Sequence, residues 1–264
     1  MRADFETIEV SRYDDQILLV TLNRPEASNA LNTRMGLDLM ELFESFSIDL
    51  EGLRVVIVTG SGKKAFCAGG DLKERNGMTD EVWQSQHAIF ERMVRAMMGC
   101  PIPLVAAVNG AAYGGGCEIA AASDFVYAAT NARFALTEVT LGIMPGAGGT
   151  QNLARAVGER RAKELILSGL AFTAQEAESW GLVNRVIEPS DLLETTLGIA
   201  RRIAANGPVA VRQAKQAIYR GMQMSMWDGL AFEIEAYNRL VPTEDRREGV
   251  LAFNERRKPI FRGR

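Results

Sequence analysis

Residues 103–122 read PLVAAVNGAAYGGGCEIAAA, and this stretch decides the fold class. An apolar run of strand length stops at the turn pair Asn109-Gly110, and three glycines then precede the helical run CEIAAA. A buried strand that leads through glycines into a helix is typical of α/β proteins. The same alternation of strand and helix patterns occurs upstream, in residues 16–23, 33–46, 54–59 and 82–98.

The balance of strand and helix patterns changes along the chain. Its first part shows a loose recurrence of strand, strand and helix. From Glu159 onward helical patterns dominate, with one strand-like interlude at residues 183–186. We therefore predict an α/β core in residues 1–190 and a helical region in residues 191–264.

Composition excludes several classes of protein. The formal net charge of −3 argues against a nucleic-acid binder. No apolar stretch reaches about 18 residues, and the N-terminus has neither a basic nor an apolar leader segment, so we expect a cytoplasmic protein with no membrane partner. Three cysteines without CxxC spacing indicate buried, reduced thiols. The single histidine, His87, excludes a histidine metal cluster, and its pattern is that of a surface helix residue.

Two glycine-rich segments are candidate ligand sites. Phe66-Cys67-Ala68-Gly69-Gly70-Asp71-Leu72 follows a strand and a turn, and its glycines let the backbone approach a ligand closely. Residues 114–116 lie where unpaired N–H groups at a helix start attract negative charge. The alternatives are a simple surface turn for the first segment and close helix–strand packing for the second.

Two glutamates are candidate acid/base groups. Glu118 lies in the first turn of an otherwise apolar helix, where a capping role is the alternative. Glu138 ends a strand-like run, where a surface loop charge is the alternative. If both face one site, burial and mutual repulsion should raise at least one pKa. A third glycine run, residues 146–151 (GAGGTQ), lacks the last glycine of a dinucleotide fingerprint and is set aside.

Together these segments resemble the crotonase (enoyl-CoA hydratase/isomerase) superfamily over nearly the whole chain. The resemblance is carried by the order and spacing of LNRPEASNAL, AFCAGGDLKE, VNGAAYGGGCEIAAASD, FALTEVTLGIMPGAGGTQ and GLVNRVI. It implies a spiral of repeated ββα units, a helical C-terminal trimerisation region, and a homotrimer or dimer of trimers. It also implies an acyl-CoA substrate and no metal or redox cofactor.

The resemblance assigns roles to individual residues. The amides of Gly70 and Gly115 would form an oxyanion hole for the thioester oxygen. Glu118 would deprotonate the water that attacks Cβ, and Glu138 would hold that water and protonate Cα. Substrate contacts would come from Ala68, Gly69, Asp71, Leu72 and Lys73.

The resemblance also leaves alternatives open. Gly70 stands where alanine is common in the family, and Thr137 where many hydratases have proline. We expect an enoyl-CoA hydratase, with an enoyl-CoA isomerase or another crotonase-type lyase or hydrolase as the alternative within the family. A non-catalytic CoA-binding or RNA-associated scaffold is the alternative from another class. The sequence does not decide the acyl group, the pathway or the choice between trimer and hexamer.

Overall fold

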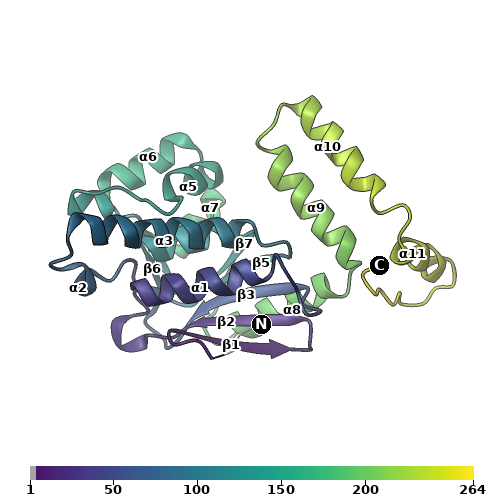
Figure 1. Ribbon diagram of the computed structural model, residues 1–264, viewed down its shortest axis with the longest axis horizontal. Coiled ribbons are helices and arrows are strands. Elements are labelled where there is room, and N and C mark those ends of the chain that lie inside the picture. The colour runs from purple at the N-terminus through teal and green to yellow at the C-terminus, as the bar shows by residue number, and fades with distance from the viewer. Residues whose placement is uncertain (1–3) are drawn as a thin grey trace.

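The computed structural model describes residues 4–264, and Figure 1 shows how the elements are arranged. Residues 1–3, with which the predicted first domain begins, lie outside the described range. The strands are β1 (Ile8–Tyr13), β2 (Ile17–Leu22), β3 (Val55–Gly60), β4 (Ala65–Cys67), β5 (Leu104–Val108), β6 (Ala111–Tyr113), β7 (Phe125–Ala129), β8 (Arg133–Ala135), β9 (Phe172–Thr173) and β10 (Arg185–Ile187). The α-helices are α1 (Thr33–Ser45), α2 (Leu72–Arg75), α3 (Asp80–Met98), α4 (Gly115–Ala122), α5 (Gly149–Val157), α6 (Glu159–Ser168), α7 (Ala174–Trp180), α8 (Leu192–Ala204), α9 (Pro208–Gly221), α10 (Met226–Asn238) and α11 (Glu244–Asn254), and the short 3₁₀ helices are η1 (Pro25–Ala27) and η2 (Glu138–Leu141).

The larger sheet has six strands in the order β1-β2-β3-β5-β7-β10. β1 and β2 form an antiparallel pair, and every other neighbouring pair in this sheet is parallel. All residues of β5 (LVAAV) are buried. Parallel strands that are covered on both faces have such continuous apolar runs, which explains the absence of polar residues in β5.

The smaller sheet has the order β4-β6-β8-β9, with the β8–β9 pair antiparallel. Three of its strands follow strands of the larger sheet after short turns, so β3 leads to β4, β5 to β6 and β7 to β8. Helices follow each of these strand pairs. The chain thus repeats a strand–strand–helix unit, and the predicted α/β fold of repeated ββα units is confirmed.

Helices cover both faces of the larger sheet. On one face α1 and α3 pack on each other and share a core with alternate residues of β2, β3 and β5. On the other face α8 buries apolar side chains against the remaining residues of the same strands. All three cysteines are buried and free of disulfides, as predicted. No helix within residues 4–264 is both long enough and apolar enough to cross a membrane.

The end of the chain leaves this core. The predicted boundary at residue 190 falls just before α8, which packs on the sheet. The helices that project from the core are α9, α10 and α11, drawn in green to yellow in Figure 1. α9 and α10 pack on each other, and the Lys215 ammonium anchors α9 to the core through the Asp124 carboxylate, 2.7 Å away. We call α9 to α11 the C-terminal arm.

The turn between β2 and α1 is tied to the segment between β3 and β4 by one buried side chain. Asn29 has a φ of 55°, a left-handed conformation that asparagine tolerates better than most residues. Its Oδ1 accepts from the Arg24 amide, and its Nδ2 donates to the carbonyls of Ser61 and Ala65, each at 2.9 Å. This side chain therefore fixes the two segments that lead into the glycine-rich loop at residues 68–70.

Asn29→Ala should lower the free energy of unfolding by about 2–4 kcal/mol, because it leaves buried backbone groups unpaired and puts alanine, which tolerates positive φ less well than asparagine, at a φ of 55°. Urea unfolding at fixed protein concentration measures the change. Asn23→Ala is the matched control, since it removes one exposed hydrogen bond, to Glu9 at 2.6 Å, and should cost less than about 1 kcal/mol. Equal costs for the two variants would contradict the role given to Asn29.

Candidate functional site

A cavity of about 1050 Å³ opens between the glycine-rich loops and one face of α3. Residues 68–70, 114–115 and 145–148 line one side of it, together with the carboxylates of Glu118 and Glu138. Trp83, His87 and Phe90 of α3 also line it. The size is within the range of small-molecule and cofactor sites. His87 is an exposed residue on a helix, as predicted, and it also lies at the wall of this cavity.

The amide of Gly70 is left free by the way its loop pairs with Leu31. The Leu31 amide donates to the Gly69 carbonyl at 2.7 Å, and the Asp71 amide donates to the Leu31 carbonyl at 2.8 Å. In such a parallel bridge, Gly70 lies between the two bonded residues, and its N–H points away from Leu31. None of the backbone hydrogen bonds within residues 4–264 uses the Gly70 N–H, which lies at the cavity wall.

The amide of Gly115 is free because it is the first residue of α4, where an N–H has no partner within the helix. Gly114, at φ +49°, makes the turn into this helix and donates to the Ala135 carbonyl at 2.9 Å. A β-carbon on Gly115 would stand 2.6 Å from Cδ1 of Leu31, so a larger residue there would require the Leu31 side chain to move. The structure thus brings two unpaired amides from separate loops to one cavity.

Glu118 is buried at the cavity wall, with 3% of its surface exposed. Its Oε1 accepts from the amides of Ala147 and Gly149, each at 2.8 Å. Burial raises the pKa of this carboxyl to about 7, with the nearby charge of Glu138 adding to the rise and the two amide hydrogen bonds opposing it. Its side chain is therefore poised to exchange a proton near neutral pH.

Glu138 begins η2 and is buried on the same cavity. Burial raises the pKa of its carboxyl, and its backbone hydrogen bond and the positive charge of Arg75 oppose that rise. Its Oε2 is buried without a hydrogen-bond partner in the part of the chain that the structure describes. A buried carboxylate oxygen without a partner is costly, so this atom is expected to bind water or substrate.

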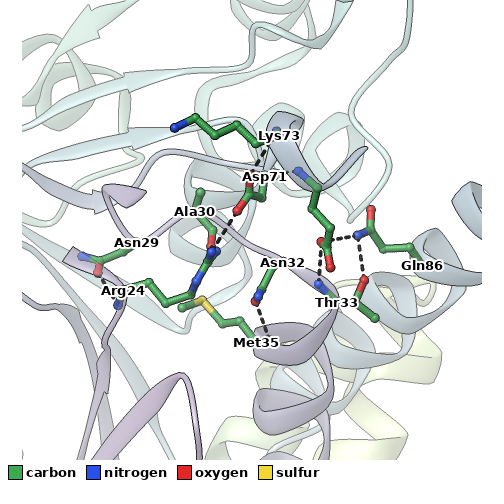
Figure 2. Close-up of polar contacts among 10 residues, drawn as sticks. Arg24, Asn29, Ala30, Asn32, Thr33, Met35, Asp71, Lys73 and Gln86 are labelled. Atoms are coloured by element: carbon green, nitrogen blue, oxygen red, sulfur yellow. Dashed lines mark hydrogen bonds and ion pairs between the residues drawn. The ribbon is translucent and has the colours of Figure 1, made fainter. Parts of the chain in front are cut away.

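The five residues predicted to contact substrate do not all lie at the cavity. Ala68, Gly69 and Leu72 line it, whereas Asp71 and Lys73 do not. Asp71 caps α2 and pairs with the Arg24 guanidinium at 2.9 Å, and Figure 2 shows its carboxylate between Arg24 and Lys73. The assignment of all five to substrate binding stays a prediction.

Sequence reasoning missed two features of the site. The first is the pair of amides at Ala147 and Gly149, which lie in the glycine run that we compared only with a dinucleotide fingerprint. The second is Arg75, two residues beyond the last one assigned to the site, whose side chain lines the cavity. A signal was present for both, because Arg75 follows AFCAGGDLKE directly and a glycine run before a helix offers free N–H groups.

The arrangement suits proton transfer beside a developing oxyanion. Two free backbone N–H groups can hold an oxygen that becomes negative in the transition state. Two carboxyl groups with raised pKa values lie on the same cavity, and that of Glu118, with a pKa of about 7, can take up and release a proton near neutral pH. Within residues 4–264, no cluster of three or more histidine, cysteine or carboxylate groups has a metal-binding arrangement.

Comparison with known proteins agrees with this geometry. The chain matches the family described as Enoyl-CoA hydratase/isomerase over residues 12–264. It is 44% identical to the short-chain-enoyl-CoA hydratase of Clostridium acetobutylicum, over 93% of this chain and 94% of that protein. It is 43% identical to the 2,3-dehydroadipyl-CoA hydratase of Escherichia coli, over 97% and 98%. A crystal structure of an enoyl-CoA hydratase from Bacillus anthracis has a TM-score of 0.96 at 43% identity and covers 98% of this chain and 100% of that one.

Glu118→Gln should stabilise the protein at alkaline pH. Burial raises the pKa of Glu118 from 4.5 to about 7, so the folded protein keeps a proton that the unfolded chain releases. The free energy of unfolding of wild type therefore falls as the pH rises from 4.5 to about 7. The glutamine variant has no carboxyl to ionise at this position, so its stability does not fall for this reason. We expect the variant to be about 2–3 kcal/mol more stable than wild type at pH 8, and to differ by less than about 1 kcal/mol at pH 5.

Urea unfolding at the two pH values measures this difference. The exposed Glu164→Gln, on α6, is the matched control and should show no gain at pH 8. A Glu118→Gln variant that is no more stable than wild type at pH 8 would argue against a strained, buried carboxylate.

Proposed function

The chain belongs to the enoyl-CoA hydratase/isomerase family, as predicted, and from that premise we propose that it adds water reversibly to the double bond of a 2-enoyl-CoA thioester. One observation carries the proposal: the two free amides of Gly70 and Gly115 and the two carboxyls of Glu118 and Glu138 lie on one cavity. An isomerase needs only one proton-transferring group beside the oxyanion hole, whereas addition of water uses both carboxyls.

The reaction balances with these groups alone. The thioester oxygen accepts hydrogen bonds from the Gly70 and Gly115 amides. The Glu118 carboxylate takes a proton from water, whose oxygen forms a bond to Cβ, and the electrons of the double bond move through Cα to make an enolate on the thioester oxygen. Cα then takes a proton from the Glu138 carboxyl. Transfer of the proton now on Glu118 back to Glu138 resets the pair.

The contacts of the two side chains support this division of roles. Two N–H donors on Oε1 favour the ionised form of Glu118 and leave its Oε2 free for water. Glu138 has an unpaired Oε2 and burial raises the pKa of its carboxyl, and we assign to it the proton that is delivered to Cα. That no metal or redox cofactor takes part, beyond the CoA of the substrate, stays a prediction, as does a cytoplasmic location.

The names of the relatives leave the acyl group open, since one is a short-chain-enoyl-CoA hydratase and another a 2,3-dehydroadipyl-CoA hydratase. A role in fatty acid metabolism is therefore a proposal on the family alone.

We also propose that the protein assembles as a homotrimer or a dimer of trimers through the C-terminal arm. Large apolar side chains are exposed along it, among them Met222, Trp227, Ile234 and Phe253, at 78%, 81%, 60% and 84% exposure. Exposed apolar surface of this extent is typical of an interface between chains. Tyr219 of α9 lines the cavity, so the arm also forms part of the site.

Crotonyl-CoA hydration, followed by the loss of enoyl-thioester absorbance, tests the function. Glu118→Gln and Glu138→Gln should each lower kcat by about two to four decades, because each removes a proton-transferring group. The activity of wild type should rise with pH on the acid side as Glu118 ionises near pH 7. Glu164→Gln should retain wild-type activity.

Two results would contradict this proposal. The first is full activity in both glutamine variants. The second is a wild-type protein that leaves crotonyl-CoA unchanged while shifting the double bond of a 3-enoyl-CoA, since that would make it an isomerase.

Trp227→Asp should reduce the oligomer to smaller species, because a buried charge at an apolar interface is costly. Light scattering coupled to size-exclusion chromatography should give three or six times the mass of the chain for wild type and a lower multiple for the variant. Trp227→Phe is the matched control and should keep the wild-type mass. A wild-type protein that elutes as a monomer would end the assembly proposal.

A further inference from the structure

Arg75 places a guanidinium group on the wall of the cavity, beside the aromatic side chains of α3. Its Cζ lies 4.5 Å from the ring centroid of Trp83 and 5.6 Å from that of Phe90. Both aromatic residues line the same cavity. The group is half-buried, and burial lowers the pKa of Arg75 while Glu74, Glu118 and Glu138 oppose the fall. Arginine stays charged in proteins, so this wall carries a fixed positive charge.

A buried amide holds this guanidinium in one orientation. The Nε of Arg75 donates to Oε1 of Gln86 at 2.8 Å. The amide nitrogen of Gln86 donates to the Thr33 hydroxyl at 2.9 Å and to Oε2 of Glu74 at 2.7 Å, and Figure 2 shows Gln86 directed at Thr33. Because both partners of the nitrogen are acceptors, the Gln86 oxygen must face Arg75. The terminal nitrogens of Arg75 are thereby directed away from Gln86 and toward the cavity.

These terminal nitrogens have no carboxylate partner among residues 4–264. In that part of the chain Arg75 takes part in no ion pair, and the one hydrogen bond of its side chain is the one to Gln86. The other arginine at the cavity, Arg95, pairs with Glu91 at 2.6 Å. The charges of Glu74, Glu118 and Glu138 act on this guanidinium from beyond ion-pair distance, so its fork of N–H donors stays open to a carboxylate.

Gly70 gives this guanidinium its room. A β-carbon on Gly70 would stand 3.1 Å from Nη1 and 3.2 Å from Cζ of Arg75, which is tighter than ordinary van der Waals contact. Position 70 commonly holds alanine in similar sequences. Glycine at this position leaves space for the Arg75 guanidinium, which the β-carbon of alanine would crowd. It also places the guanidinium next to the loop whose amide would hold the thioester oxygen.

We propose that Arg75 determines specificity for an acyl group that carries a second carboxylate, so that the substrates are 2-enoyl-CoA thioesters of dicarboxylic acids. This inference rests on the proposed hydratase function and names the substrate class of the same site. The distal carboxylate accepts hydrogen bonds from the terminal nitrogens of Arg75, while Trp83 and Phe90 hold the guanidinium from its faces. The charge of Arg75 also offsets the repulsion between that carboxylate and the two glutamates.

Two CoA thioesters of equal length test the inference: trans-2-hexenedioyl-CoA, which has a distal carboxylate, and trans-2-hexenoyl-CoA, which has a methyl group there. The measured quantity is the ratio of their kcat/KM values at pH 8, because any effect of Arg75 on the pKa of Glu118 or Glu138 is common to both substrates and cancels. We expect wild type to prefer the dicarboxylyl substrate at least tenfold. Arg75→Met should lower the ratio about 100-fold, and Arg75→Lys should lower it less.

Arg92→Met is the matched control, since Arg92 lies on α3 outside the cavity and pairs with Glu44. It should keep the wild-type ratio. A wild-type ratio near one, or an Arg75→Met variant with an unchanged ratio, overturns the role of Arg75 while hydration of hexenoyl-CoA still upholds the proposed function. If wild type hydrates neither substrate, the proposed function itself fails, and this specificity fails with it.

Discussion

The pairing of Leu31 with the loop at residues 69–71 is the constraint on which the rest of the site depends. The backbone of Leu31 bonds to Gly69 and Asp71 on either side of Gly70, and this turns the Gly70 amide to the cavity. The side chain of the same residue fills the space in front of Gly115. One residue thus contacts both of the glycines that we propose as oxyanion donors, which come from loops about 45 residues apart in the chain.

Much of the fold could be predicted from the sequence, because long apolar strands and amphipathic helices have clear periods. The helix predicted at residues 33–46 is α1, and the strand predicted at residues 103–108 is β5. The sequence does not indicate β4 and β6 as strands, because three residues are too few to show an alternation. β4 and β6 pair with each other, and a glycine-rich loop follows each of them. The glycine-rich loops could therefore be predicted from the sequence, whereas the small sheet that supports them could not.

The parts of the site that could be predicted from the sequence are those marked by an unusual residue type in its local pattern. Three glycines before a helix indicate Gly115, and a glutamate in an otherwise apolar helix indicates Glu118. The direction of a long side chain is different, because it depends on which helix packs against it. Arg75 lies at the end of α2, and its turn toward the cavity depends on Gln86 and Trp83 of α3, which no local pattern connects to it. The same reason explains why Asp71 does not line the cavity. Its carboxylate pairs with Arg24, which lies far upstream in the chain.

The cavity has two walls of different origin. The glycine loops and glutamates follow strands of the two sheets, while Trp83, Phe90 and the support of Arg75 belong to α3. Substitutions on the side of α3 that faces the cavity can therefore alter which acyl groups are accepted without moving the two glutamates. Such a division would let a lineage of duplicated genes acquire new substrates by small steps, each of which leaves a working catalyst.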